Sequence, residues 1–214
     1  MKDIIIVCAG GYGIEVYSEM KEHNRLAREK GREEPYHILG FISDDPDALK
    51  GKTFVTEPIL GSILEWQPSS RERYALGLGK PESKTKVATM LKERGAIFES
   101  IISPYANVSR DLQMGEGCFI TSATIGADVI LGSFVNINGS TLYSGSTIGD
   151  FTTVTGYSVI ERAAIGKCVH VGSKAVITEG CHVGDYAHIA AGSVVTEDVP
   201  EKALVFGVPA KVIG

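Results

Sequence analysis

A six-residue period dominates the sequence from Met114 to Val195. Each period begins with an aliphatic residue, often followed by glycine, and small or polar residues fill the rest. No α-helix repeats every six residues, and a half-buried strand repeats every two. A three-sided coil explains the period, because each six-residue side can point its aliphatic residue inward while successive coils hydrogen-bond to one another. The sequence therefore predicts a parallel β-helix of hexapeptides.

The inward aliphatic positions follow from the spacing. They are predicted to be Met114, Ile120, Ile125, Leu131, Ile137, Leu142, Ile148, Val154, Val159, Ile165, Val171, Ile177, Val183, Ile189 and Val195. A small residue four positions after most of them is expected to fill the corner, namely Cys118, Val129, Val135, Ser146, Thr152, Ala163, Val169, Ala175, Cys181, Ala187 and Ser193. The steps from 120 to 125, 137 to 142 and 154 to 159 have five residues, so one side of each coil is predicted to be shorter. Residues 17 or 18 positions apart then form columns with the inter-strand spacing of about 4.8 Å.

Composition and cysteine usage narrow the function classes. The net charge of −5 argues against a surface dedicated to nucleic acid or anionic membranes. No stretch approaches the ~20 apolar residues of a membrane span, and the short apolar start differs from a signal peptide. Cys8, Cys118 and Cys181 stand apart in apolar surroundings, which favours buried thiols in a reducing compartment over disulfides or structural zinc. We expect a cytoplasmic protein that binds no metal, does not insert into membranes and has no nucleic-acid partner.

The first hundred residues have the pattern of an α/β unit. Asp3–Ala9 is a continuous apolar strand, a glycine turn follows at residues 10–13, and Ile14–Lys21 has helical periodicity. Such a turn allows close backbone approach, and the helix N-terminus offers N–H groups to an anion. The turn reads G-G-x-G rather than G-x-G-x-x-G, so a tight turn without a ligand is an equal alternative.

Two carboxylates follow the second predicted strand. His37–Ser43 reads as this strand, and Asp44 and Asp45 come directly after it. Side chains at the carboxyl edge of an α/β sheet lie where ligands bind. The alternative is a β-turn and helix cap made by aspartate and the following proline.

The remaining elements place the domain boundary. A third strand is predicted at Tyr74–Gly77 and an amphipathic helix at Ser83–Arg94, after which the chain passes through Pro104 into the coils. We therefore expect an α/β domain at residues 1–103 and a β-helix at residues 104–214.

Several motifs together point to a family. The chain carries the glycine turn, GFISDD at residues 40–45, ISPYA at 102–106, AAGSVVTEDVP at 190–200 and FGVPAKVIG at 206–214. This arrangement resembles the bacterial hexapeptide-repeat sugar acyltransferases, in particular UDP-amino-sugar N-acetyltransferases and sialic-acid O-acetyltransferases. The resemblance implies a Rossmann-like nucleotide-sugar-binding domain, a left-handed β-helix, a homotrimer, and acetyl-CoA bound in the groove between two protomers.

The resemblance also implies binding roles. The turn that approaches the nucleotide phosphates matches Gly10, Gly11, Tyr12 and Gly13. Asp44 and Asp45 match an acidic pair near the base. Ser173 and Ala191 match corner positions whose main chain bonds to the pantetheine arm of acetyl-CoA. Lys211 is implied as the partner of a CoA phosphate, and a surface lysine without a contact is the alternative.

The family's catalytic positions differ in this chain. With residues 148–150 (IGD) as the anchor, Ser144 stands where the family has its histidine, and Gly145 stands where it has an acidic residue. A second expected histidine is Thr153, which keeps the position of a substrate contact, while Asn138 retains the family's asparagine. A histidine near neutral pKa is the usual general base, and a serine alone does not replace it.

Other side chains are candidates to take part. Glu161 is predicted one coil above Ser144 in the same column, which makes it the best substitute base. His170 and His188 are predicted to stack one coil apart, either as solvated or trimer-packing residues or as substrate or CoA contacts. The histidine spacing does not suit a zinc site.

The leading hypothesis is an acyl-CoA-dependent transferase acting on a nucleotide-linked amino sugar or a related sugar. One alternative is a catalytically weak or inactive relative that binds sugar nucleotides as a trimer. Another is an acetyltransferase for a different small amine or alcohol. The CoA-binding corners and the closing motif favour an enzyme, whereas Ser144, Gly145 and Thr153 favour a binding protein.

Overall fold

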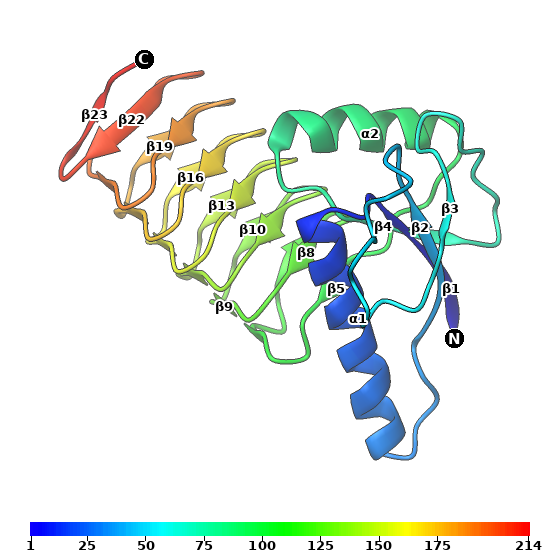
Figure 1. The fold of residues 1–214 in the computed structure, drawn as a ribbon. Coiled ribbons are helices and arrows are strands. Elements are labelled where there is room, and N and C mark those ends of the chain that lie inside the picture. Colours follow the sequence, from blue (N-terminus) through cyan, green and yellow to red (C-terminus); the bar gives the residue numbers. More distant parts are fainter. The chain divides into compact units, whose positions relative to one another are not determined.

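The computed structural model describes all 214 residues, which form two compact units (Figure 1). The N-terminal unit comprises residues 1–79 and 83–104, and the solenoid comprises residues 80–82 and 105–214. Neither helix of the chain combines the length and apolarity needed to span a bilayer.

A parallel four-stranded sheet with the order β3-β2-β1-β4 forms the N-terminal unit. Its strands are β1 (Lys2–Val7), β2 (Tyr36–Ile42), β3 (Ile59–Gly61) and β4 (Arg73–Leu76). Ile4, Ile5, Ile6 and Val7 of the central strand are all at most 1% exposed, as a parallel strand covered on both faces requires. The three strands expected from the sequence are confirmed within two residues, whereas β3 lacked a sufficient apolar run to be predicted.

Two helices accompany the sheet, α1 (Gly11–Glu29) and α2 (Pro81–Glu93). Helix α1 begins in the glycine turn and continues well beyond Lys21 into the charged segment, where Arg25 pairs with Glu22 and Glu29. With only two helices, the unit does not show the full Rossmann-like pattern.

Short strands, nearly all of two residues, stack into three sheets that are parallel except for the last strand, and these sheets build the solenoid (Figure 1). The first sheet contains β7 (Gln113–Met114), β10 (Ile130–Leu131), β13 (Thr147–Ile148), β16 (Ala164–Ile165) and β19 (His182–Val183). The second contains β8 (Phe119–Ile120), β11 (Asn136–Ile137), β14 (Thr153–Val154), β17 (His170–Val171), β20 (His188–Ile189), β22 (Leu204–Gly207) and the antiparallel β23 (Ala210–Val212). The third contains β6 (Asn107–Val108), β9 (Thr124–Ile125), β12 (Thr141–Leu142), β15 (Val159–Ile160), β18 (Val176–Ile177) and β21 (Val194–Val195). A further short strand, β5 (Ile101–Ile102), precedes β6.

The inward column of aliphatic residues is confirmed with two exceptions. Ile148, for example, is 2% exposed and lies in register between Leu131 and Ile165. Met114 is 37% exposed because β7 is the edge strand of the first sheet. The other exception is Val159, which was expected to point inward.

Ile160, and not Val159, points into the core of its coil. Ile160 is fully buried and aligns with Leu142 and Ile177. Val159 and Ile160 are both aliphatic, so spacing alone could not choose between them, and only the ladder with Leu142 decides the register. The five-residue step of this coil therefore runs from Ile160 to Ile165, on a different side from the earlier ones.

Small residues fill the corners as expected, and most of the polar ones hydrogen-bond to the main chain. Ser146 Oγ donates to the carbonyl of Tyr143 at 2.7 Å, and Thr152 Oγ1 donates to that of Gly166 at 2.7 Å. Both side chains are fully buried. The four cysteines are free thiols, of which only Cys8 is partly exposed, so its expected burial is incomplete.

Candidate functional site

Three loops meet at the carboxyl edge of the N-terminal sheet. They follow β1, β2 and β4 and contain the glycine turn, Asp44 with Asp45, and Gly77 with Gly79. This edge is where parallel α/β sheets bind ligands. A methyl group on Gly13 would overlap the carbonyl oxygen of Cys8, and one on Gly77 would overlap the backbone of Gly13. Glycine is therefore required where the first and third loops pack together.

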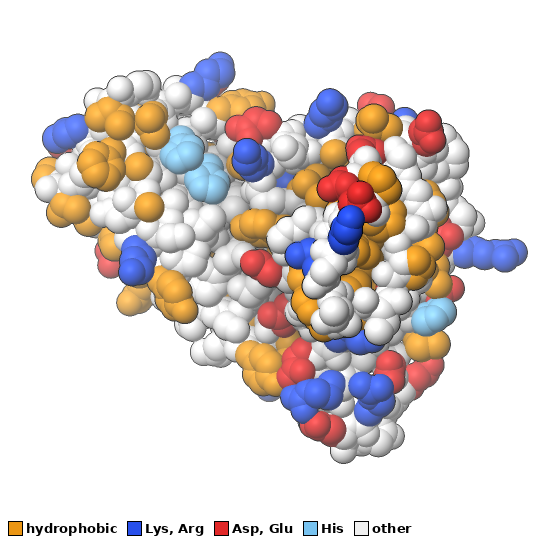
Figure 2. Space-filling model, viewed as in Figure 1, with side chains coloured by type: hydrophobic (Ala, Val, Ile, Leu, Met, Phe, Trp, Pro, Cys, Tyr) orange, Lys and Arg blue, Asp and Glu red, His pale blue; other side chains and the backbone are white.

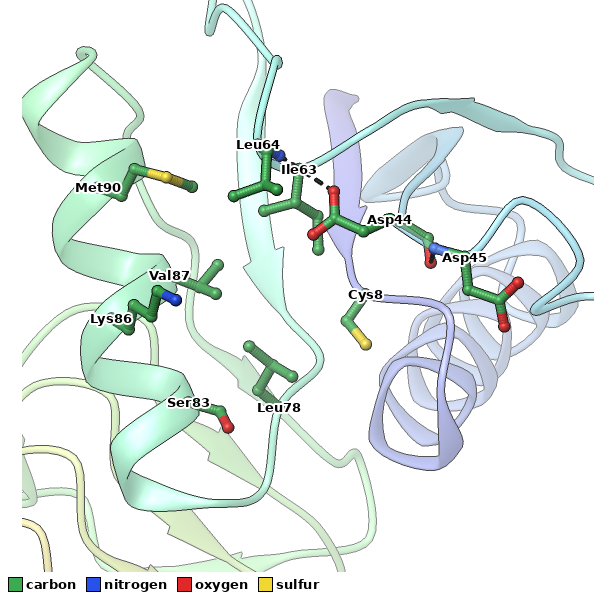
Figure 3. A pocket seen from close by; sticks show the side chains of 11 residues that line it. Cys8, Asp44, Asp45, Ile63, Leu64, Leu78, Ser83, Lys86, Val87 and Met90 are labelled. Atoms are coloured by element: carbon green, nitrogen blue, oxygen red, sulfur yellow. Dashed lines mark hydrogen bonds between the residues drawn. The ribbon is translucent and has the colours of Figure 1, made fainter.

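A cavity of about 390 Å³, here called the sheet-edge pocket, opens beside these loops (Figure 3). Ser83, Lys86, Val87 and Met90 of α2 line one side. The opposite side and floor come from Cys8, Ser43, Asp44, Asp45, Ile63, Leu64 and Leu78. The lining is mainly apolar, and Lys86 carries its cation across from the carboxylate of Asp44. Such a slot suits a flat, partly polar group such as a nucleobase.

The acidic pair makes local hydrogen bonds. Asp44 Oδ1 accepts hydrogen bonds from Ser62 Oγ at 2.5 Å and from the backbone N–H of Leu64 at 3.1 Å. The Ser62 hydroxyl foremost, with main-chain donors, holds the pKa of the Asp44 carboxyl below its ordinary value. Asp45 Oδ1 accepts from the N–H of Asp47 at 2.9 Å, and Figure 3 shows its carboxylate directed away from α2. Asp44 thus anchors a pocket wall, and Asp45 has the turn-stabilising contact of the alternative reading.

The glycine turn adjoins the pocket, but none of its four residues lines it. The ring of Tyr12 packs on Gly79, and α1 starts at Gly11 with no side-chain cap. Sequence reasoning missed Lys86 and Met90, since a helical period alone does not tell which helix face borders a pocket. The predicted third strand could have pointed to this segment. Residues that follow a parallel strand lie at the carboxyl edge of the sheet, next to the loops after β1 and β2.

A second cavity, here called the corner cavity, lies on the solenoid and has a volume of about 370 Å³. Its lining comes from three successive coils, after β12, β15 and β18, and consists of Tyr143, Ser144, Glu161, Arg162 and Glu179. Arg162 Nη1 pairs with Glu179 Oε1 at 3.2 Å. No histidine lines this cavity.

The structure brings two of the three predicted catalytic residues together. Ser144 and Glu161 line the same cavity, while Asn138 lies on the turn after β11 and outside that lining. The expected alignment of Glu161 with Ser144 is wrong in detail. Leu142 aligns with Ile160, so Glu161 follows its strand as Tyr143 follows β12. Because the five-residue step of this coil starts at Ile160 and does not end at Val159, each residue after the strand aligns one position earlier than expected, and Glu161 aligns with Tyr143.

The predicted CoA contacts fall in two places. Ser173 and Ala191 occupy the same corner of successive coils, and the N–H of Gly192 donates to the carbonyl of Ser173 at 2.9 Å. Lys211 lies apart on β23, with its ammonium 3.5 Å from the carboxylate of Glu197. Thr153 lies on β14 and is fully buried.

The two stacked histidines are confirmed as neighbours. His170 and His188 are in register on β17 and β20, with ring centroids 4.8 Å apart, and Figure 2 shows adjoining histidine side chains on the surface. No group of three or more His, Cys, Asp or Glu side chains is arranged to hold a metal ion.

Comparison with known proteins supports the repeat and the fold. Residues 162–197 match the family described as bacterial transferase hexapeptide (six repeats). A 45-residue stretch is 58% identical to the 2,3,4,5-tetrahydropyridine-2,6-dicarboxylate N-acetyltransferase of Enterococcus faecalis. That match covers 21% of this chain and 19% of the relative, so the chain spans about a fifth of the length of the curated relative that it matches.

Solved structures match along the whole chain. PerB from Caulobacter crescentus, in complex with CoA and GDP-perosamine, has a TM-score of 0.84 at 23% identity, covering 100% of this chain and 98% of that one. The acetyltransferase domain of PglB from Neisseria gonorrhoeae, in complex with acetyl coenzyme A, has a TM-score of 0.82 at 21% identity, covering 99% of both chains. WeeI from Acinetobacter baumannii has a TM-score of 0.80 at 22% identity and full coverage of both.

The chain thus carries the hexapeptide repeat at residues 162–197 and shares the fold of these solved structures. The resemblance inferred from the sequence motifs is confirmed, and the similarity in fold to these structures extends along the entire chain.

Proposed function

We propose that the protein transfers an acyl group, acetyl foremost, from acyl-CoA to a nucleotide-linked amino sugar or related sugar. The observation that carries this proposal is the whole-chain similarity to PerB, a structure in complex with both CoA and GDP-perosamine. The four free thiols support action in a reducing compartment such as the cytoplasm.

In this proposal the N-terminal unit, residues 1–103, is a Rossmann-like domain that binds the nucleotide. The sheet-edge pocket takes the base between Val87 and Leu64, with Lys86 and Asp44 as its polar contacts. The start of α1 after Gly10 and Gly11 faces the phosphates, since a helix N-terminus stabilises anions. Of the acidic pair, Asp44 is the better candidate for contacting the base, because the Asp45 carboxylate already accepts a hydrogen bond from the N–H of Asp47 within its own turn.

The solenoid, residues 104–214, is proposed to be a left-handed β-helix that binds acetyl-CoA. Main-chain groups at Ser173 and Ala191 hold the pantetheine arm, because corner backbone atoms of adjacent coils form a regular row of donors and acceptors. Lys211 contacts a CoA phosphate, for which it exchanges its partner Glu197. Both residues of that pair are largely exposed, so the exchange costs little.

Acyl transfer is assigned to the region of Ser144, Glu161 and Asn138, whereas Thr153, which is fully buried on β14, is not assigned a role in it. The serine hydroxyl is available for a hydrogen bond to the acceptor but is too weak a base to ionise it. Without a histidine in the corner cavity, we expect slow transfer at neutral pH.

The proposed assembly is a homotrimer whose CoA-binding grooves lie between protomers. Flat β-helix faces favour such packing, and a closed ring satisfies each face. Light scattering at micromolar concentration should give about three times the 22.8 kDa mass of one chain. A mass near that of one chain would contradict the assembly.

A mass-spectrometric screen tests the function. Acetyl-CoA is incubated with the protein and a panel of UDP-, GDP- and CMP-linked sugars, and CoA release and an acetylated product are measured together. Acetylation of one acceptor supports the proposal. Intact binding of CoA and a nucleotide without turnover would favour the second candidate, a sugar-nucleotide-binding trimer, which the absence of a histidine in the corner cavity also favours.

A further inference from the structure

One wall of the sheet-edge pocket is a loop, here called the loop wall, which comprises residues 62–66 after β3. It contributes Ile63 and Leu64 to the lining. Ile63 is buried, whereas Leu64 is 58% exposed. Packing therefore fixes the loop wall at one residue, and hydrogen bonds must fix it at the next.

Hydrogen bonds hold the loop wall from two sides. Asp44 Oδ1 accepts from Ser62 Oγ at 2.5 Å and from the N–H of Leu64 at 3.1 Å. From the other side, Arg94 Nη1 donates to the carbonyl oxygens of Leu64 at 2.8 Å and of Trp66 at 3.1 Å. The main chain of Leu64 is thus bonded to Asp44 through its N–H and to Arg94 through its carbonyl.

Arg94 belongs to the opposite wall of the pocket. It follows the last residue of α2 and continues its final turn, since its N–H donates to the carbonyl of Leu91 at 3.2 Å. Val87, Met90 and Arg94 are three and four residues apart, so they lie on the same side of this helix. In Figure 3, Met90 points from α2 toward Leu64. The guanidinium therefore joins the helix wall to the loop wall at one end of the pocket.

We propose that Arg94 is a positioning residue for base recognition, which fixes the separation of the two pocket walls and, through Leu64, the direction of the Asp44 carboxylate. The inference rests on the proposed function, in which this pocket takes the base of a nucleotide. It adds a residue that sets selectivity among bases although it is not part of the pocket lining.

Base selectivity requires such support because of how bases differ. Their flat apolar faces are similar, and they are distinguished by the donors and acceptors along their edges. Asp44 and Lys86 can discriminate between edges only when both are held in place. A guanidinium suits the supporting role, because it is always charged and presents its donors in a rigid plane.

Calorimetric titration of the full-length protein with UDP, GDP and CDP tests the inference, because these ligands differ only in the base. We expect the wild type to prefer one base. Arg94→Gln should narrow the ratio of the weakest to the tightest Kd roughly tenfold, as the loss of a hydrogen bond to a charged group implies. The affinity for CoA should stay unchanged.

Arg73→Gln is the matched control. Arg73 Nη1 also donates to two main-chain carbonyls, those of Ser70 and Glu72, but none of these residues lines the pocket. This variant loses the same kind of contact within the same unit of the chain. It should therefore keep the full wild-type ratio among the three nucleotides.

Trp66 provides a second readout, because it is the single tryptophan of the chain. Its indole N–H donates to the hydroxyl of Tyr74 at 3.1 Å, and its carbonyl accepts from Arg94. Acrylamide should quench its fluorescence more strongly in Arg94→Gln than in the wild type. The preferred nucleotide should reduce this quenching in the wild type.

Two results would overturn the inference alone: equal affinity of the wild type for the three nucleotides, or an unchanged ratio in Arg94→Gln, including a uniform loss of affinity. If Arg94→Gln does not fold, Arg94→Lys decides. Lysine keeps the charge without the rigid plane, so an intermediate ratio is expected and a full wild-type ratio would contradict the inference. Absence of binding of all three nucleotides by the wild type would overturn the proposed nucleotide site, and the inference with it.

Discussion

In the solenoid, each inward side chain packs against the same position of the coils before and after it. Ile148 lies between Leu131 and Ile165, one coil away on either side. In the N-terminal sheet, by contrast, Ile5 of β1 is paired with Gly40 and Tyr74, which are much farther along the chain. The solenoid therefore repeats the same contact between residues one coil apart, whereas the N-terminal unit depends on a few contacts between distant parts of the chain, each of which occurs once.

Because of this difference, the residues that stabilise the fold and the residues that could bind a ligand are distinct in the solenoid but partly the same in the N-terminal unit. Repetition fixes the solenoid backbone and leaves corner side chains such as Ser144 and Glu161 free to vary. In the N-terminal unit the loops that would hold a ligand also hold the fold, as the packing of Gly13 against Cys8 and Gly77 shows.

The largest expected effect is a charge placed in the solenoid core. Ile165 is 3% exposed, so Ile165→Asp buries an unpaired carboxylate and should cost several kcal/mol of unfolding free energy. Ile130, two strands away in the same sheet, is 46% exposed, and Ile130→Asp should be nearly neutral. Thermal melting compares the two variants. If Ile165→Asp melts within a few degrees of wild type, the inward register is wrong.

A methyl group in the N-terminal turn should have the next largest effect. Gly13→Ala forces the first loop away from Cys8 and Gly77, at a cost on the order of 3 kcal/mol. A methyl group on Gly11 meets nothing within 4 Å, so Gly11→Ala should be neutral or slightly stabilising. Urea denaturation measures both. Equal stability of the two variants would show that the glycine contact does not hold these loops.

Restoring a histidine to the corner cavity should raise the transfer rate. A general base contributes typically 10²–10⁴-fold, so Ser144→His is expected to accelerate acyl transfer by about 10²-fold. Gly145 is left unchanged, because its φ of +78° would strain a glutamate there. Ala127→His is the control one coil away, at the residue whose carbonyl accepts from the N–H of Gly145. An equal increase in transfer rate in both variants would contradict the assignment of the general-base position to residue 144.

The smallest effect concerns pH and the N-terminal unit. Burial raises the pKa of Glu57, but hydrogen bonds from Tyr17, Thr56 and Lys21 outweigh it, so the pKa of this carboxyl lies below its ordinary value. A lowered pKa stabilises the fold above the unfolded value of about 4.3, and this contribution is lost as pH falls through the folded pKa.

Tyr17→Phe isolates this contribution. The buried hydroxyl donates to Glu57 Oε2 at 2.6 Å, and its loss should cost about 1–2 kcal/mol at pH 7. The difference from wild type should shrink as the pH falls through the lowered pKa of Glu57, because protonation removes the charge from the hydrogen-bond acceptor. Denaturation over a series of pH values from 7 downward measures it, and a pH-independent difference would assign the effect to packing alone.

The two regions also differed in how far the sequence predicted them. Nearly the whole inward column was predictable, because each coil repeats the evidence of the last. The exception at Val159 and Ile160 arose where two aliphatic neighbours satisfied the same spacing, and it displaced Glu161 from the column of Ser144. In a repeat protein, a shift of one residue leaves the core pattern intact and changes the site.

The sheet-edge pocket was only partly predictable. The positions of Asp44 and Asp45 followed from the strand before them, but their partners did not. Ser62 and Leu64 approach Asp44 from a loop some twenty residues away, and Lys86 comes from a helix farther still. Such contacts depend on how loops close around the sheet, which local patterns do not specify.

Hydrogen–deuterium exchange of the full-length protein tests most directly the central claim that the two regions bind different substrates. The protein is measured alone, with CoA, and with the nucleotide that it binds among UDP, GDP and CMP. We predict that CoA slows exchange in solenoid peptides containing Ser173 and Ala191, and that the nucleotide slows exchange around residues 8–13, 43–45 and 77–90. Protection of the solenoid corners by the nucleotide alone, or of the sheet-edge loops by CoA alone, would contradict the account.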